Sequence, residues 1–324
     1  MDGPRFLAVA GPTASGKTEL SVALREHMDI EVISMDSRQV YQGMDVGTAK
    51  VTPADRLNIP HHGLDLVPPN RRYSAGQFGR DVRRWVDEIQ GRGRVPVLVG
   101  GTGFFLKSVM EPIFAEPPLD GERLEKLRAY LAGQDATELA RWVHRLDPFR
   151  AEVAVQGGPQ RMSRTIEVAL LSGRPLSWWH REAPAEADGL HGLVVVLDLP
   201  REEMDRRIDA RVERMVERGL VAEVRRLLDD GYTISDPGMT GAGYREIAEH
   251  LRGETTLEEA MEKMRNVTRR YSRRQLTWFR HQLPSSVPRI DAMLPVQEQL
   301  SATLFSWVAA GGRMPSTTLT QATP

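Results

Sequence analysis

Residues 6–24 read FLAVAGPTASGKTELSVAL. The stretch opens with an apolar run typical of a buried β-strand, and residues 19–24 at its end have the character of a helix. Between them, residues 11–18 match the pattern G-x-x-x-x-G-K-[ST] at every fixed position, in the strand–loop–helix order that this pattern requires. In such a loop, backbone N–H groups at a helix N-terminus bind phosphate, while Lys17 adds a mobile cation and Thr18 offers a hydroxyl to Mg²⁺. The sequence therefore predicts binding of a diphosphate or of a triphosphate such as ATP.

The composition limits the class of protein. The chain has 324 residues, with 43 Lys and Arg against 44 Asp and Glu, so any basic surface must come from local clustering. It has no cysteine, which excludes disulfides, thiolate nucleophiles and cysteine-based zinc sites. No apolar run is long enough to span a bilayer, and residues 1–5 lack the features of a signal peptide. We expect a cytoplasmic monomer that does not contact membranes, with a disordered tail over residues 311–324.

Polar residues follow two further apolar runs. Residues 30–34 read as a strand that leads into Asp36, and residues 95–99 read as a buried strand that leads into a glycine-rich turn with Thr102. Ligands of open parallel sheets lie beyond the carboxyl ends of the strands. We therefore expect Asp36 and Thr102 at the same edge as Lys17. An alternative for Asp36 is an ordinary helix N-cap.

The α/β alternation stops after residue 112. Helical patterns then predominate over residues 122–132, 135–146, 148–155 and 160–172, before a strand-like run returns at residues 193–199. The sequence predicts an α/β fold, a P-loop NTPase-like parallel sheet flanked by helices, with an all-helical insertion domain. The core takes in residues 1–112 and 187–310 and the insertion residues 113–186.

Two segments predict a polyanionic partner. Residues 263–281 hold seven Lys and Arg and no acid, with Tyr271 and Trp278 among the cations. Arginine suits phosphate, and aromatic rings offer surfaces on which unpaired bases stack. Residues 160–164 form a smaller basic patch, for which an ordinary amphipathic helix is an equal alternative.

Seven segments, in order along the chain, resemble the motifs of the tRNA dimethylallyltransferases. They are residues 11–18, 33–41, 43–50, 100–103, 159–164, 243–245 and 274–280. The resemblance covers about residues 6–282, and the ordered set is far more specific than the phosphate loop alone. It implies transfer of a dimethylallyl group from dimethylallyl diphosphate to N6 of the adenosine just 3′ of the anticodon, in tRNAs that read codons starting with U. Diphosphate is released.

The resemblance also implies roles for individual residues. Asp36 would be the base at N6, with Thr102 beside the reacting groups and with Thr13, Lys17 and Arg211 completing the catalytic set. The residues expected to hold the diphosphate are Gly11, Pro12, Thr13, Ala14, Ser15, Gly16, Lys17, Thr18, Arg207 and Arg211, with Mg²⁺ at Thr18. The residues expected to contact the tRNA anticodon stem-loop are Asp36, Ser37, Arg38, Gln39, Thr102, Gln160, Arg161, Met162, Ser163, Arg164, Gly243, Tyr244, Arg245, Arg273, Arg274, Gln275, Trp278 and Arg280.

Two other functions stay open from the residues themselves. One is prenylation of free adenine nucleotides, which would need neither the helical insertion nor the basic helix. The other is a small-molecule kinase, since Asp36 could serve a metal ion and nothing in the sequence excludes phosphoryl transfer.

Overall fold

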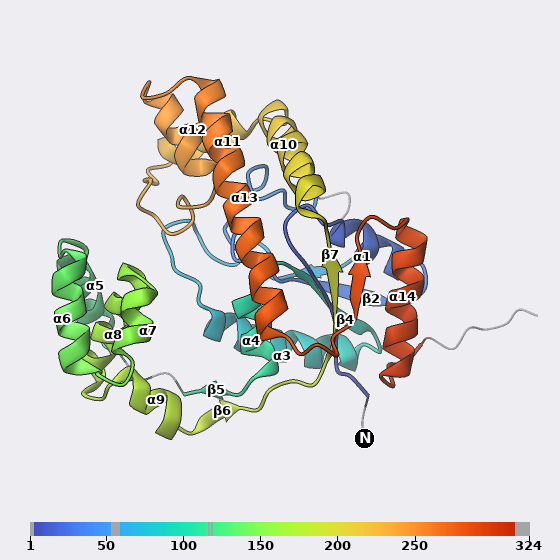
Figure 1. Ribbon diagram of the computed structural model, residues 1–324, viewed down its shortest axis with the longest axis horizontal. Helices are drawn as coiled ribbons and strands as arrows, with labels where there is room; N and C mark the ends of the chain where they lie inside the picture. Colours follow the sequence, from blue (N-terminus) through green and yellow to red (C-terminus); the bar gives the residue numbers. More distant parts are fainter. Residues whose placement is uncertain (1–2, 53–58, 116, 118, 315–324) are drawn as a thin grey trace, which may run out of the picture. The chain divides into compact units, whose positions relative to one another are not determined.

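The computed structural model describes residues 3–52, 59–115, 117 and 119–314 (Figure 1). The chain divides into two compact units, one of Met1–Glu111 with Leu190–Pro324 and one of Pro112–Gly189. Most of the tail for which disorder is expected, residues 315–324, lies outside the described residues.

The larger unit is built on a six-stranded parallel sheet with the order β3-β2-β4-β1-β7-β8. The strands are β1 (Leu7–Ala10), β2 (Ile30–Ser34), β3 (His61–His62), β4 (Val95–Gly100), β7 (Leu193–Asp198) and β8 (Arg289–Asp291). The central strand β1 is fully buried because its apolar run packs on both faces of the sheet. The α/β fold predicted from the sequence is confirmed.

Helices flank this sheet. The chain passes from β1 through α1 (Lys17–Arg25) to β2, then back through α3 (Ala75–Gly91) to β4. Because such crossovers are right-handed and the two run in opposite directions, α1 and α3 cover opposite faces. Helix α4 (Gly103–Met110) packs beside α3, and α14 (Val296–Ala309) packs beside α1.

Among its described residues, this unit also contains α10 (Arg201–Glu217), α11 (Leu220–Asp229), α12 (Tyr244–Leu251) and α13 (Leu257–Gln282). Gly219, with φ of 96°, separates α10 from α11. Residues 256–264 and the basic segment, in contrast, form the single 26-residue helix α13. Figure 1 shows α13 running from the group of α10 and α12 down to α4.

The smaller unit is mainly helical. It contains α5 (Gly121–Ala132), α6 (Ala136–Leu146), α7 (Ala151–Gln156), α8 (Pro159–Ser172) and α9 (Leu176–Glu182) around a small apolar core. The strands β5 (Ile113–Phe114) and β6 (Ala185–Ala187) form an antiparallel pair in the same unit. Neither this pair nor α9 had a clear sequence signal.

Candidate active site

The phosphate loop has the backbone that its glycines predict. Gly11 has φ of 154°, and a Cβ there would lie 2.8 Å from the Leu197 carbonyl oxygen. Gly16 has φ of 85° and is the N-cap of α1, so that the helix N-terminus points into the loop. Ala14, with φ of 68°, adopts the left-handed conformation without being a glycine. The loop therefore presents backbone N–H groups in the arrangement expected for an anion site.

Lys17 begins α1 and turns back over the loop. Its Nζ donates to the Pro12 carbonyl oxygen at 2.5 Å and lies 3.3 Å from the Ser15 hydroxyl. Burial and, to a smaller extent, the nearby Arg211 charge lower the pKa of Lys17 to about 7, although the Asp36 charge opposes the shift. An incoming anion would favour the charged form of Lys17 for the same electrostatic reason.

The ends of β2 and β4 are joined directly. The Met35 N–H donates to the Val99 carbonyl oxygen, and the Thr102 N–H donates to the Met35 carbonyl oxygen. The Ser37 N–H donates to the Thr102 hydroxyl at 3.1 Å. A Cβ at Gly100 would lie 2.1 Å from the Met35 carbonyl oxygen, so this approach requires glycine. The structure thus brings Asp36 and Thr102 together beside the phosphate loop, as expected from the sheet edge.

A cavity of about 510 Å³ opens over this edge and is rich in cations. Its lining includes Thr13, Ala14, Ser15, Gly16, Lys17, Thr18, Asp36, Gln39, Arg207, Arg211, Arg214 and Gln275. A second cavity of about 200 Å³ has more apolar walls, from Ile208, Val212, Met215, Met264 and Val267. Thr13, Asp36 and Arg211 line both cavities.

Helix α10 supplies the arginines of the larger cavity. Arg207 donates to Glu203 Oε1 at 2.6 Å and to the Ala14 carbonyl oxygen at 3.4 Å. Arg211 donates to the Thr48 carbonyl oxygen at 3.4 Å. Burial lowers the pKa of the Arg211 guanidinium from its usual value, Asp36 opposes this shift, and Arg214 adds to it. Both arginines come from one helix face because they lie four residues apart.

A buried carboxylate that sequence reasoning missed holds the loop of residues 43–50. Glu223 on α11 accepts hydrogen bonds from the N–H groups of Asp45, Val46 and Gly47 at 2.9, 2.8 and 3.0 Å. It also accepts from the Tyr244 hydroxyl at 2.7 Å. Burial and the Glu223 charge raise the pKa of Tyr244 well above its usual value. The position of Glu223 on the apolar face of an amphipathic helix is the sequence feature that could have predicted its burial.

The same loop is fixed from its other end by Lys50. The Lys50 side chain is fully buried, and its Nζ donates to Asp45, Asp65 and the Tyr41 carbonyl oxygen. Gln39 then joins the loop to the site, because its amide contacts the carbonyl oxygens of Thr48 and Ala49.

The inner face of α13 also lies against the site. Gln275 is 7% exposed and donates to the Gly101 carbonyl oxygen, while its Oε1 accepts from Thr13. Burial and the Asp36 charge raise the pKa of Tyr271, and hydrogen bonding to Thr102 and Ser37 opposes that rise. Tyr271, which was predicted only as one of the interleaved aromatics, therefore lies next to the expected base.

The basic segment of α13 is partly neutralised by acids of the helix packed beside it. Arg273 contacts Asp205 and Arg269 contacts Asp209, both on α10. The segment contains no acid in its own sequence, but some of its arginines form ion pairs with acids of α10. Among the described residues, no ion pair is formed by the exposed cations Arg270, Arg274 and Arg280.

Some residues expected to contact RNA have buried side chains. Tyr244 is 1% exposed in the larger unit and Met162 is 2% exposed in the smaller one. Gln275 is likewise buried, but it lines the larger cavity and Tyr244 lines the smaller one, so that contact of these residues with RNA stays a prediction. Arg38 is engaged by the Pro237 carbonyl oxygen and the Thr240 hydroxyl.

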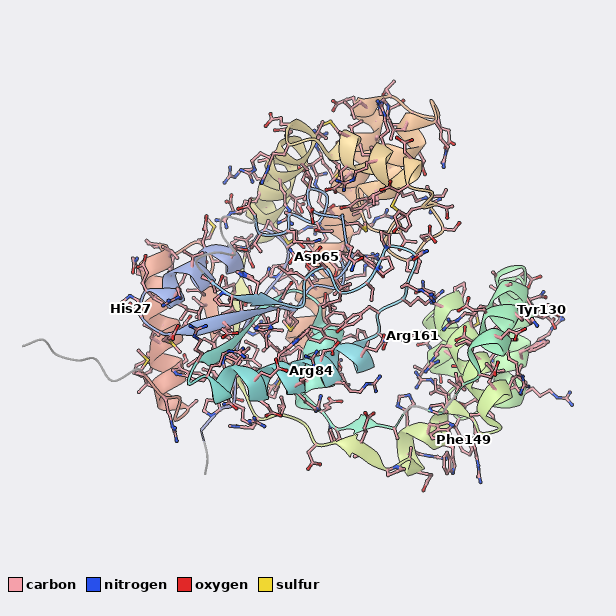
Figure 2. All side chains as sticks on the ribbon, turned by 180° about the vertical axis from the view of Figure 1, so that it is seen from behind. His27, Asp65, Arg84, Tyr130, Phe149 and Arg161 are labelled. Atoms are coloured by element: carbon pink, nitrogen blue, oxygen red, sulfur yellow. The ribbon has the colours of Figure 1, made fainter. Side chains whose placement is uncertain are left out.

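Other expected RNA contacts stay accessible. Arg245 is exposed beside Glu249, next to Gly243, which has φ of 97°. Trp278 is half-buried against Gly103, where a Cβ would lie 2.2 Å from its ring. Gln160, Arg161, Ser163 and Arg164 lie on α8 of the smaller unit, and Figure 2 labels Arg161 there.

The described residues hold no group of three or more His, Asp or Glu side chains that could bind a metal ion. Among the same residues, no helix has both the length and the apolar character needed to cross a membrane. Thr18 is exposed in the first turn of α1, at the edge of the larger cavity.

A parallel sheet whose first strand leads into this loop, with the cavity at its carboxyl edge, defines an α/β protein of the P-loop class. A family model described as IPP transferase matches residues 39–282, and one described as isopentenyl transferase matches residues 4–60. The chain therefore belongs to the tRNA dimethylallyltransferase family, the IPP transferases.

Individual relatives agree with this assignment. A tRNA dimethylallyltransferase 2 of Geotalea uraniireducens is 39% identical over 278 residues, which are 86% of this chain and 90% of the relative. A tRNA dimethylallyltransferase of Thermomicrobium roseum is 41% identical over 278 residues, 85% of this chain and 83% of the relative. The crystal structure of the full-length tRNA isopentenylpyrophosphate transferase from Bacillus halodurans matches with a TM-score of 0.67 at 31% identity, over 94% of this chain and 97% of that one.

Proposed function

We propose that this protein transfers a dimethylallyl group from dimethylallyl diphosphate to N6 of the adenosine 3′-adjacent to the anticodon, in tRNAs that read codons starting with U. The observation that carries the proposal is the position of Asp36. It lies between a cation-rich cavity over the phosphate loop and a more apolar cavity, and it lines both together with Thr13 and Arg211. A phosphoanhydride on one side and a base with an apolar fragment on the other fit these two environments.

The cationic groups would act on the leaving diphosphate. An allylic C–O bond breaks readily when the charge that develops on the diphosphate is neutralised by fixed donors. The N–H groups of residues 16–18 at the start of α1, the Lys17 ammonium and the Arg211 guanidinium would surround that position. Arg207 would assist from the neighbouring turn of α10, where it already contacts the loop at Ala14.

Asp36 would handle the proton of the attacking amine. The exocyclic amine of adenine is a weak nucleophile because its lone pair is delocalised into the ring. A carboxylate that accepts one N–H orients the amine and takes its proton as the C–N bond forms. Asp36 Oδ1 already accepts from the Arg38 N–H at 2.8 Å, which fixes the carboxylate, and Thr102 would lie beside the reacting atoms.

Magnesium fits as an ion carried by the diphosphate. Mg²⁺ keeps several waters and takes only one or two protein ligands when phosphate oxygens are available. The Thr18 hydroxyl is accessible at the cavity, and the described residues offer no cluster of acids that would bind the ion alone. Bound there, Mg²⁺ would supply further positive charge to the leaving group.

The RNA would be held by the outer face of α13 and by residues outside the reaction centre. Arg274 and Arg280 are exposed on α13, Arg245 is exposed on α12, and Arg161 and Arg164 lie on α8. These arginines provide phosphate contacts, and Trp278 offers a ring to a base. We also propose that the protein works as a monomer in the cytoplasm, where its RNA substrate is.

Prenyl transfer to undermodified tRNA tests the proposal. Purified protein is incubated with labelled dimethylallyl diphosphate and tRNA from a strain that lacks the modification, and label in the RNA is measured. We expect one label per tRNA at the adenosine 3′ of the anticodon. Label in AMP but not in tRNA would favour prenylation of free nucleotides, and ATP consumption without prenyl transfer would favour a kinase.

The variant Asp36→Ala tests the base. Turnover should fall by roughly 10²-fold or more while tRNA affinity is retained, because general-base contributions are typically of this size. Asp36→Asn is the matched control, since it keeps the shape and can still accept from the Arg38 N–H. Loss of tRNA binding in both variants, at normal turnover per bound complex, would refute the assignment.

A further inference from the structure

The amide of Gln275 connects three parts of the larger unit. Its Oε1 accepts from the Thr13 N–H at 2.9 Å and lies 3.2 Å from the Thr13 hydroxyl. Its Nε2 donates to the Gly101 carbonyl oxygen at 2.9 Å. One side chain of α13 thus binds the phosphate loop and the end of β4 at the same time. Both ends of the amide are used, so its orientation is fixed.

The packing around this amide is tight. Gln275 is 7% exposed, and a Cβ on Gly101 would lie 2.3 Å from its Nε2. The amide fits here because Gly101 has no side chain. A buried amide with two good partners is costly to displace, because its partners would be left without hydrogen bonds. Gln275 therefore holds Thr13, which lines both cavities, in one position.

Exposed cations lie on other sides of the same helix. Arg270 and Arg280 are exposed, and Arg274 is exposed where it lines the smaller cavity, whereas Gln275 and Leu276 are buried. The helix thus carries cations for RNA on its outer face and the anchor of the phosphate loop on its inner face. A rigid helix with both faces engaged is a physical connection between two ligand sites, and a coupling between sites acts equally in both directions.

We propose that Gln275 is a positioning residue that fixes the phosphate loop to α13 and thereby couples RNA binding on this helix to diphosphate binding at the loop. The inference rests on the proposed function for the identity of the two ligands. Gln275 lines the larger cavity, and we assign it no part in the chemical step. Its effect is exerted through Thr13, whose N–H it holds away from the cradle and whose hydroxyl it orients.

The variants Gln275→Leu and Gln275→Glu test the positioning role. Leu removes both hydrogen bonds at similar volume, while Glu keeps an acceptor for Thr13 but loses the donor to Gly101 and adds charge beside the cavity. Binding of inorganic diphosphate is measured by calorimetry. We expect its Kd to rise roughly five- to tenfold in Q275L, on the scale of one or two hydrogen bonds, and further in Q275E. Kd for tRNA should change less than twofold.

Gln299→Leu is the matched control. Gln299 is 6% exposed on α14 and donates to the Leu294 carbonyl oxygen at 2.7 Å, so its loss also removes a buried amide contact. This side-chain hydrogen bond lies within residues 294–299, outside the loop and α13, and the diphosphate Kd of Q299L should equal that of the wild type. An equal rise in Q299L and Q275L would show a general loss of stability and overturn the positioning role.

The coupling is measured with an anticodon stem-loop RNA in which the target adenosine is replaced by purine riboside. This nucleoside lacks the N6 amino group, so that no reaction occurs. In the wild type, this RNA should lower the diphosphate Kd several-fold, and in Q275L the ratio should approach one. A ratio of one in the wild type, or an unchanged ratio in Q275L, would overturn the coupling. The proposed function fails separately, if the wild type binds diphosphate but never prenylates tRNA.

Discussion

Replacing Glu223 by Gln should loosen the loop of residues 45–47 and slow the reaction. In the native protein, Glu223 Oε2 accepts from the N–H groups of Asp45 and Val46, and Oε1 accepts from Gly47 and from the Tyr244 hydroxyl. An amide has only one oxygen. Whichever way the Gln lies, its NH₂ group faces at least one backbone N–H that has lost its acceptor.

The magnitude follows from that geometry. A buried donor without an acceptor costs about 1–3 kcal/mol, and hydrogen bonds to a charged group are worth about 1.5–3 kcal/mol against about 1 kcal/mol for neutral ones. Glu223 is only 7% exposed, so water replaces little of this loss. We expect E223Q to lower the free energy of opening this loop by about 2–4 kcal/mol. Tyr244→Phe, which removes a single hydroxyl, should cost about 1 kcal/mol.

Hydrogen exchange resolves the effect locally. The amides of residues 45–47 should exchange roughly 30- to 1,000-fold faster in E223Q, on the exchange scale that corresponds to this free energy. Turnover should fall with it, because Thr48 accepts from Arg211 and Gln39 contacts Thr48 and Ala49. If E223Q exchanged within twofold of the wild type at these amides, the carboxylate would not hold the loop and the reasoning would be wrong.

Three further predictions concern charge. Arg274→Ala should weaken tRNA binding and reduce the slope of log Kd against log salt concentration by about one. Arg273→Ala should have a smaller effect, because Asp205 already pairs with Arg273. Equal slopes in the wild type and R274A would show that Arg274 does not contact the RNA. Hydrogen bonding to Arg92 is the main cause that lowers the pKa of the buried Glu31 carboxyl to about 2, so Glu31 stabilises the fold above its unfolded value of 4.5 and this contribution is lost as the pH falls toward 2. Urea unfolding of the wild type and Glu31→Gln should therefore differ by about 1–2 kcal/mol at pH 6 and converge near pH 2, and a constant difference would contradict the shift. Burial lowers the pKa of Lys17 to about 7, so Lys17 loses its charge above that pH and affinity for inorganic diphosphate should fall as the pH rises from 7 to 9. Lys17→Met corrects for ionisation of the diphosphate itself, and the same pH dependence in that variant would rule out Lys17 as its source.

The sheet edge was predictable from the sequence because its parts are local. A strand, a glycine-rich loop and a helix follow one another in residues 6–24, and parallel strands bring their carboxyl ends together by construction. Asp36 and Thr102 could therefore be placed before their contact through Ser37 was known. The short strands β3 and β8 could not, because a run of two or three residues has no periodicity and depends on its neighbour in the sheet.

Glu223 and Lys50 were missed for a different reason. Lys50 stands in a polar loop that looks like solvated surface, and Glu223 is a single acid among apolar helix positions. Their hydrogen-bond partners come from other segments of the chain. The partners of Arg273 and Arg269 show the same limit. Their acids lie on α10, more than fifty residues away, so a segment that is basic in sequence is partly neutral in the fold.

Gln275 shows where sequence reasoning could have gone further. Ser272, Gln275, Leu276 and Phe279 follow the spacing of one helix face, and all four are buried. A polar residue on such a face needs partners inside the protein. The glycines at 100, 101 and 103 mark where those partners come close, because a Cβ at each would collide with Met35, Gln275 or Trp278. Helix periodicity and glycine spacing together thus point to a contact between α13 and the end of β4 that neither indicates alone.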